Sequence, residues 1–146
     1  MKLLEQLKPL GLLLLRAALG VIFIFHGYPK LFTSTHQTMQ FFEHSGLPGY
    51  FVYIAGVFEF FGGIMLIVGL FTRVAALLLA AEMFVALWKV HGFFANPMAV
   101  DNYQFPLVVA AGAFALATLG AGLISIDHVV FGDGRGKSMR KQKDRD

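Results

Sequence analysis

The sequence has 146 residues, of which 57% are hydrophobic and 14% are charged. Soluble domains average about 45–50% apolar and about 25% charged residues, so these charges are too few to cover a water-soluble body of this size. The chain contains no cysteine, which excludes disulfides, zinc–thiolate sites, iron–sulfur clusters and thiol redox chemistry by its own residues. The composition therefore predicts one membrane-embedded domain, in which a metal or haem would have only histidine and oxygen ligands.

The first predicted element is a membrane span at residues 10–27, preceded by an N-terminal segment, residues 1–9, that contains two lysines. Lysines followed by a leucine run are also typical of a cleavable signal peptide. However, Arg16 interrupts the apolar run, and no clear cleavage site of small residues follows before Gly27. We therefore expect a retained helix.

A polar stretch that is rich in Pro, Gly and short side chains follows, and a short interfacial helix is predicted within it at residues 39–44. Three further apolar runs come after this stretch. They lie at residues 51–71, 74–90 and 105–126, and each approaches the roughly 20 residues that cross a bilayer core. The short connection at residues 70–73 requires antiparallel neighbours. The sequence therefore predicts an all-α membrane protein, an antiparallel four-transmembrane-helix bundle within residues 10–131.

Lysine and arginine residues are distributed unequally between the two predicted sides of the membrane. Lys2, Lys8, Arg73 and the six basic residues of the C-terminal segment lie on one side, and Lys30 and Lys89 on the other. Because cytoplasmic loops carry the excess of basic residues, we expect a bacterial inner (plasma) membrane protein with both termini in the cytoplasm. Residues 132–146 are predicted to form a basic, disordered cytoplasmic tail against anionic lipid rather than a nucleic-acid site.

Three ionisable residues lie inside predicted spans: Arg16, Glu59 and Glu82. Such residues are costly in lipid and are generally paired or functional. Their estimated depths overlap, so Arg16 is expected to form a forked pair with one glutamate, leaving the other to share it or to take up a proton. An inert lock between helices and a ligand or proton site are equally compatible with this arrangement.

A second polar group is predicted at the outer ends of the helices. His26 and His91 lie at similar heights on different helices, where they are compatible with axial haem ligation or with hydrogen bonds to a quinone. Solvated interfacial histidines are the more common case, and no metal site is expected. Lys89 lies seven residues after Glu82 on the same helix face and extends the polar stripe outward.

The whole pattern resembles the DoxX family of small bacterial membrane proteins, which is related to the DoxD-type subunit of thiosulfate:quinone oxidoreductase. The resemblance covers residues 12–132. The motifs that carry it are Arg16 with Gly20, the run HGYPKLF at 26–32, EFFGG at 59–63, GLFTR at 69–73, and Gly120 and Gly122 followed by Ser125 and Asp127. The chain departs from the family pattern at Ala121, Leu123 and Gln104.

The resemblance implies an inner-membrane protein with a redox connection and no established reaction, at most a subunit of an oxidoreductase. Gly62, Gly63, Arg73, Gly120 and Gly122 are then motif positions with structural roles. From the residues themselves, Ser125 and Asp127 are placed to cap or to hydrogen-bond the backbone at the cytoplasmic end of the fourth helix.

Three functions compete on this basis. The first is a quinone-linked or redox-accessory subunit that works with a partner enzyme; no cofactor is certain, and a quinone is the candidate. The second is a non-catalytic scaffold that docks a partner, and the third, less favoured, is a small-solute or proton pathway, for which four short helices are narrow unless the chain forms a homo-oligomer.

Overall fold

The computed structural model describes residues 1–132, and all the regular secondary structure in this part of the chain is helical, with no strand. Its elements are α1 (Lys2–Gln6), α2 (Lys8–Tyr28), the π-helical turn η1 (Pro29–Thr33), α3 (Thr35–His44), α4 (Phe51–Val68), α5 (Thr72–Lys89), α6 (Val100–Leu119) and α7 (Ile126–Phe131). The predicted all-α fold is confirmed. The predicted C-terminal tail, residues 132–146, lies outside the described residues except for Gly132.

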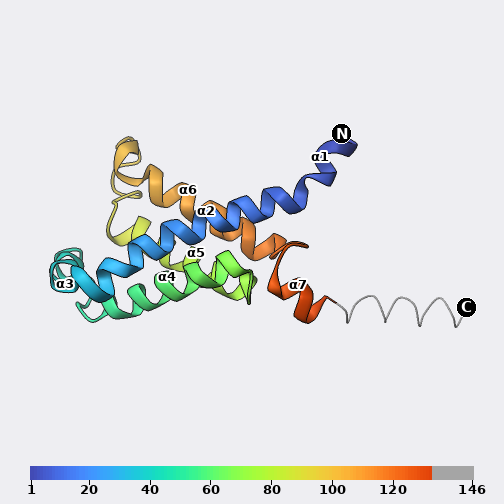
Figure 1. Ribbon diagram of the computed structural model, residues 1–146. Helices are drawn as coiled ribbons and strands as arrows, with labels where there is room; N and C mark the ends of the chain where they lie inside the picture. The colour runs from blue at the N-terminus through green and yellow to red at the C-terminus, as the bar shows by residue number, and fades with distance from the viewer. Residues whose placement is uncertain (133–146) are drawn as a thin grey trace, which may run out of the picture.

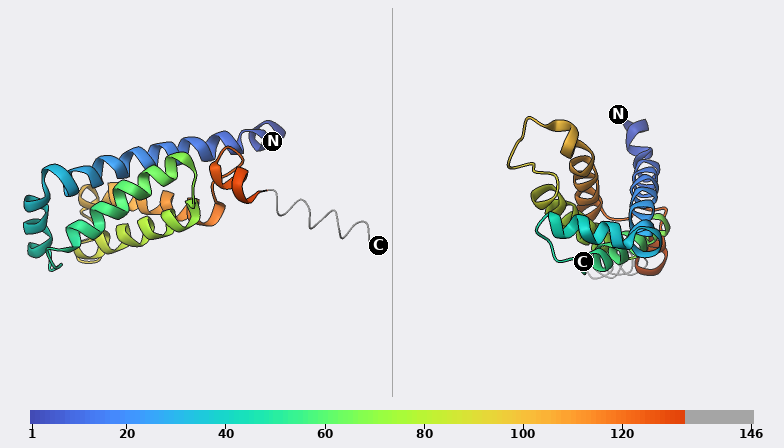
Figure 2. Two further views of the ribbon diagram at one scale, coloured as in Figure 1. Left: turned by 60° about the horizontal axis from the view of Figure 1, so that its bottom comes forward. Right: turned by 90° about the vertical axis from the view of Figure 1, so that its left-hand side faces the viewer.

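The four long helices run along one axis, with α3 folded across one end and both α1 and α7 at the other (Figure 1, Figure 2). The most extensive interfaces join α2 to α4 and α5 to α6, α4 also packs on α5, and the contact between α2 and α6 is smaller. Along the chain the four helices alternate in direction, so neighbours are antiparallel (Figure 1, Figure 2). Helix α6 ends at Leu119, well before residue 126, because Gly120 has a φ of +85° that stops the helix.

Three segments are long and apolar enough to cross a membrane: Lys8–Thr33, Phe51–Val68 and Val100–Leu119. Helix α5 has 18 residues but contains three charged residues, Arg73, Glu82 and Lys89. The protein therefore has several helices that are apolar enough to cross a membrane, and the crossing of the membrane by α5 stays a prediction.

Glycines allow α2 and α4 to approach each other closely. A Cβ atom added at Gly20 would lie 2.7 Å from the carbonyl oxygen of Gly63, and one added at Gly63 would lie 2.7 Å from that of Gly20. One helical heptad away, a Cβ atom at Gly27 would lie 2.8 Å from the carbonyl oxygen of Gly56. Two glycines on each helix, seven residues apart, thus form the contact, as expected for helices that pack in lipid.

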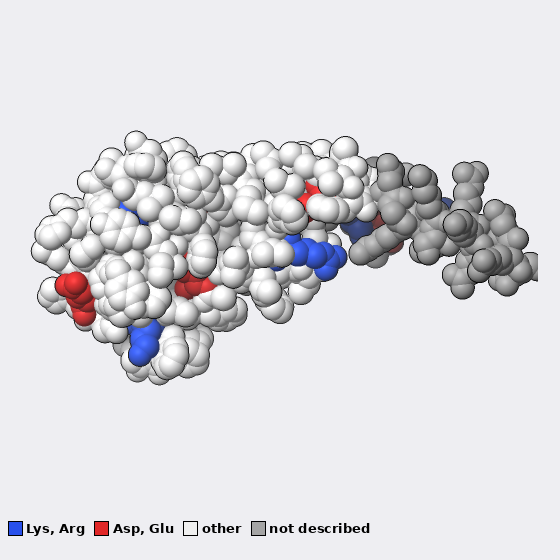
Figure 3. Space-filling model, turned by 90° about the horizontal axis from the view of Figure 1, so that it is seen from below, with Lys and Arg blue, Asp and Glu red and all other residues white. Residues whose placement is uncertain are grey.

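The core between the four helices is apolar, with buried side chains from each of them: Leu19, Phe23, Leu66, Leu79, Val109 and Leu116. The outer surface is also rich in large apolar side chains, many of them more than 40% exposed. Figure 3 shows one face on which isolated charged side chains interrupt an otherwise uncharged surface. A bundle that is apolar both inside and outside matches a lipid environment.

Candidate functional site

A buried ion pair joins the end of the first long helix to α4. Glu59 is 1% exposed, and its Oε2 accepts a hydrogen bond from Nζ of Lys30, whose side chain is 17% exposed. Lys30 lies in the turn η1, which begins at Pro29. Proline lacks the N–H group that would continue the α-helical hydrogen bonds, and a wider π turn accommodates this loss. The bond that marks the π turn is donated by the amide of Ser34 to the carbonyl of Pro29, five residues earlier, at 2.7 Å. The turn thereby directs Lys30 toward α4.

Glu82 of α5 lies beside this pair. It interacts electrostatically with both Glu59 and Lys30, and its Oε2 is buried without a hydrogen-bond partner among the described residues. We call Lys30, Glu59 and Glu82 the Lys30 cluster. It brings together three helical elements and contains two carboxyl groups and one ammonium group, so it carries a net negative charge unless a proton or another cation is held there.

His26 lies at the edge of the Lys30 cluster. Its side chain is exposed, it interacts electrostatically with Glu59, and its ring stacks on Phe105 of α6 with centroids 5.4 Å apart. Nδ1 of His26 donates a hydrogen bond to the carbonyl of Ile22 at 2.8 Å, and the other ring nitrogen, Nε2, takes no part in that bond. Beside it, the rings of Tyr28, Phe32 and Phe60 pack on one another with centroids 5.0–6.3 Å apart.

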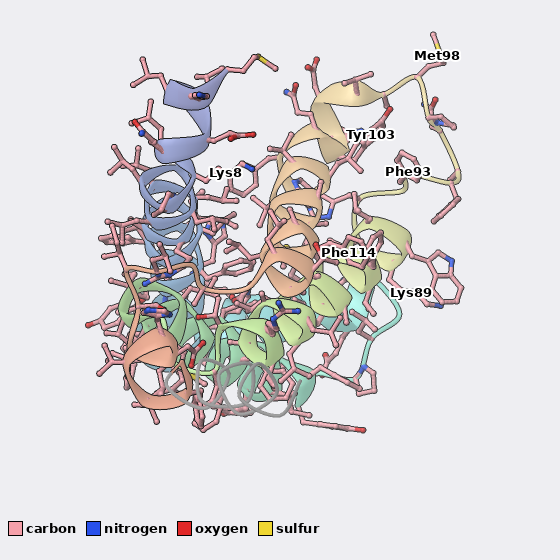
Figure 4. All side chains as sticks on the ribbon, turned by 90° about the vertical axis from the view of Figure 1, so that its right-hand side faces the viewer. Lys8, Lys89, Phe93, Met98, Tyr103 and Phe114 are labelled. Atoms are coloured by element: carbon pink, nitrogen blue, oxygen red, sulfur yellow. The ribbon has the colours of Figure 1, made fainter. Side chains whose placement is uncertain are left out.

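The other outer-end candidates have local contacts of their own. Nζ of Lys89 lies 4.7 Å from the ring centroid of Trp88, and Figure 4 places Lys89 on the side of the bundle away from α2. Nδ1 of His91 contacts the carbonyl oxygen of Ala86 at 3.1 Å. Within residues 1–132, no group of three or more His, Asp and Glu residues is placed to hold a metal ion.

Arg16 is buried, as its sequence position suggested, but its partners differ from those predicted. Its side chain is 1% exposed and makes four hydrogen bonds, all to backbone carbonyl groups. Nε donates to Leu66 at 2.8 Å, Nη2 to Ile67 at 2.9 Å, and Nη1 to both Ala121 and Ile124 at 2.7 Å.

The prediction that Arg16 pairs with Glu59 or Glu82 is therefore wrong. The carbonyl groups that Arg16 binds on α4 lie seven and eight residues beyond Glu59, which is about 10–12 Å along a helix that rises 1.5 Å per residue. Arg16 instead satisfies carbonyls that the end of α4 leaves without helical partners, where the helix dipole also favours positive charge. These contacts tie α2 to the end of α4 and to the connection after α6.

Asp127 also acts at a different place from the one predicted. Its Oδ1 and Oδ2 accept hydrogen bonds from the backbone amides of Phe71 and Thr72, at 2.7 and 2.8 Å, so Asp127 caps the start of α5. Ser125 caps the start of α7, where its Oγ accepts from the amide of His128 at 3.1 Å. Neither residue caps the last turn of α6, because the turns at Gly120 and Gly122, both with positive φ, carry the chain past it. Ser125 does hydrogen-bond the backbone near this end, since its Oγ donates to the carbonyl of Gly122 at 2.8 Å.

The remaining motif residues pack around the same connections. Gly62 faces Leu79 of α5, to which a Cβ atom would come within 3.1 Å. Nη2 of Arg73 lies 3.5 Å from the carbonyl oxygen of Leu119, and its guanidinium group covers Gly120. Gly62 thus brings α4 close to α5 within the bundle, and Arg73 joins the start of α5 to the end of α6 at the end of the bundle that contains α1 and α7.

Replacing Asp127 by alanine is expected to destabilise the fold by about 1–2 kcal/mol, since two amides at the start of α5 lose their acceptor. One of these amides belongs to Phe71, whose φ of +47° is a strained conformation that the Asp127 contact holds in place. The thermal midpoint in detergent measures this loss. Replacing Asp101, an exposed acidic residue in the first turn of α6, by alanine is the control, and an equal midpoint for both variants would contradict the capping role.

The pairing of Lys30 does not follow from the sequence pattern, which places Lys30 only among the basic residues at the outer ends of the helices. The available signal was the position of Lys30 directly after Pro29, because a proline at a helix end changes where the next side chain points. The partner of Glu59 is thus a lysine from a helix terminus and not the arginine in the span.

Comparisons with known proteins agree with the motifs. Residues 11–92 match the family model DoxX. The chain is 32% identical to "Putative oxidoreductase CatD" of Bacillus subtilis over 84% of its own length and 88% of that protein. It is 29% identical to "Inner membrane protein YqjF" of Escherichia coli, over 86% and 96% of the two chains. It is 33% identical to "Inner membrane protein YphA" of Escherichia coli, over 82% and 90%.

No solved structure gives a significant match to the chain. The relatives and the apolar helices together support a multi-pass inner membrane protein. Since the family model covers more than half of the chain, and since the relatives align along most of their length, the protein belongs to the DoxX family.

Proposed function

We propose that this protein is a quinone-linked, redox-accessory subunit of the bacterial inner membrane, and that the Lys30 cluster is its polar site. The observation that carries the proposal is the buried Oε2 of Glu82, which has no partner among the described residues although Lys30 and Glu59 are close to it. An unpaired buried carboxylate oxygen is costly, and such groups are typical of sites that bind a ligand or a proton.

The surroundings of the cluster suit the head group of a quinone. Lys30 supplies a nitrogen donor for a carbonyl oxygen of the quinone, and Nε2 of His26, whose Nδ1 carries the ring proton, can accept a hydrogen bond from a hydroxyl of the hydroquinone. Glu82 supplies a carboxyl group that can exchange a proton with these oxygens. The packed rings of Tyr28, Phe32 and Phe60, which are tilted relative to one another, supply an apolar surface.

Electron transfer requires a partner. A quinone takes up two electrons and two protons when it becomes a hydroquinone, and this chain has no cysteine for a redox centre of its own. In the proposed role, the partner subunit supplies the electrons, and the Lys30 cluster binds the head group and exchanges protons with it. The name of the Bacillus subtilis relative, which includes the word oxidoreductase, supports a redox connection.

We also propose that α5 crosses the membrane with α2, α4 and α6 and that both termini face the cytoplasm. Helix α5 is 18 residues long, and two of its charged residues, Arg73 and Lys89, lie at its ends. The third, Glu82, belongs to the Lys30 cluster. The first described residues and α7 lie at the same end of the bundle, which four crossings require (Figure 1).

Replacing Glu82 by glutamine is expected to weaken the binding of a short-chain quinone analogue at least tenfold, because the carboxyl group that exchanges a proton with the head group is lost. The purified variants are compared with the wild type by extracting and quantifying the quinone that remains bound, and by titrating the analogue against the thermal midpoint. Replacing Glu43, an exposed carboxylate of α3 at the same end of the bundle, by glutamine is the matched control. A wild-type protein that binds no quinone, or equal affinity in both variants, would reject the proposal.

A further inference from the structure

A cavity of about 580 Å³ lies at the end of the bundle that contains α7. The start of α5, the end of α6, the connection between α6 and α7, and α7 itself line it. The Lys30 cluster is at the opposite end of the long helices, so occupancy of this cavity does not depend on the proposed quinone-linked role. Two of the apolar segments, which end at Val68 and Leu119, have their terminus at this level, which places the cavity near the membrane surface.

The charges that line the cavity leave one cation without an acidic partner among the described residues. Arg73 is exposed and has only a long contact of 3.5 Å with the carbonyl of Leu119, while the single ion pair of residues 1–132 is Lys30 with Glu59. Asp127 also lines the cavity, but both of its oxygens accept backbone amides, and it interacts electrostatically with the buried Arg16. The charge of Asp127 is thus opposed by Arg16, and Arg73 leaves the cavity positive.

The rim of the cavity is apolar. The rings of Phe71 and Phe131 lie with their centroids 5.7 Å apart, and both side chains are more than half exposed. Val74 and Leu119, also in the lining, are 58% and 62% exposed. A guanidinium group beside exposed apolar side chains at the level of the membrane surface matches an amphipathic ligand with an anionic head.

We propose that this cavity binds an anionic phospholipid, with its phosphate on the guanidinium group of Arg73 and the first part of its acyl chains against Phe71 and Phe131. His128 lines the same cavity and offers a further nitrogen donor. A guanidinium group binds phosphate through two parallel hydrogen bonds, which a lysine at the same place does not reproduce.

The test is the thermal midpoint of the full chain in neutral detergent, with phosphatidylglycerol, phosphatidylcholine or inorganic phosphate added, together with native mass spectrometry of bound lipid. Phosphatidylglycerol is expected to raise the midpoint of the wild type more than phosphatidylcholine does. The Arg73→Gln variant is expected to lose at least half of that increase, and Arg73→Lys to retain an intermediate part.

Lys2→Gln is the matched control, because Lys2 is an exposed cation at the same end of the bundle but outside the cavity. Both Arg73 variants keep the basic C-terminal segment, so general attraction of anionic lipid to that segment affects all variants equally. Equal midpoint increases in the wild type and Arg73→Gln would overturn the proposal. An increase that inorganic phosphate alone reproduces in full would also overturn it, by assigning the site to free phosphate.

Discussion

The Arg16→Leu variant is expected to accumulate poorly in the membrane and to lose about 3–5 kcal/mol of folding free energy, which is typical when one member of a buried charged network is removed. Leucine leaves the carbonyl groups of Leu66, Ile67, Ala121 and Ile124 without the donor that binds all four in the native protein. These carbonyls belong to the end of α4 and to the connection after α6. The loss therefore loosens both segments at once.

Arg16→Lys is expected to fail almost as severely. An ammonium group donates from a single point, whereas the guanidinium group donates from three nitrogen atoms that face different carbonyls. Accumulation in isolated membranes and the thermal midpoint in detergent measure both effects. Lys8→Leu, an exposed cation on the same helix, is the control. If Arg16→Lys had a wild-type midpoint but lost quinone binding, Arg16 would belong to the ligand site, contrary to the contacts described above.

The second large effect is expected at the contact between α2 and α4. A Cβ atom at Gly63 would lie 2.7 Å from the carbonyl oxygen of Gly20 and 2.9 Å from the backbone nitrogen of Ile24. Both neighbours are backbone atoms, which cannot rotate away as a side chain can, so the two helices must separate. Gly63→Ala is expected to cost about 1–3 kcal/mol, as overpacking does, and Gly63→Val more.

Gly11→Ala is the matched control, because nothing lies within 4 Å of a Cβ atom added at Gly11 and that residue is also in a helix. Alanine there is expected to be neutral or to stabilise the helix by up to about 1 kcal/mol. The thermal midpoint of each variant in the same detergent gives the comparison. A midpoint for Gly63→Ala equal to that of Gly11→Ala would show that α2 and α4 do not approach as closely as described.

Separation of α2 from α4 has a consequence at the opposite end of the bundle. Gly27 and Gly56 form the second close approach, and Lys30 follows Gly27 by three residues. Any shift of α2 therefore moves Lys30 relative to Glu59. The glycine positions and the Lys30 cluster are thus linked through one interface.

Much of the helical architecture could be predicted from the amino-acid order. The apolar runs at residues 10–27 and 51–71 correspond to α2 and α4, because burial in lipid depends on the length and composition of a single segment. Helix α6 begins and ends earlier than predicted. Its apolar run continues to residue 126, and hydrophobicity alone does not reveal that Gly120 adopts a positive φ.

The partners of the charged residues could not be predicted in the same way. From composition and depth, the sequence by itself determined that Arg16, Glu59 and Glu82 are unusual residues in apolar helices. Only the tertiary structure decided that Arg16 binds carbonyl groups, that Lys30 binds Glu59, and that Asp127 caps α5. The reason is geometric: a helix turn advances 5.4 Å, so the partner of a side chain depends on which turns are adjacent and on the path of the connecting loops, and neither is encoded in a single segment.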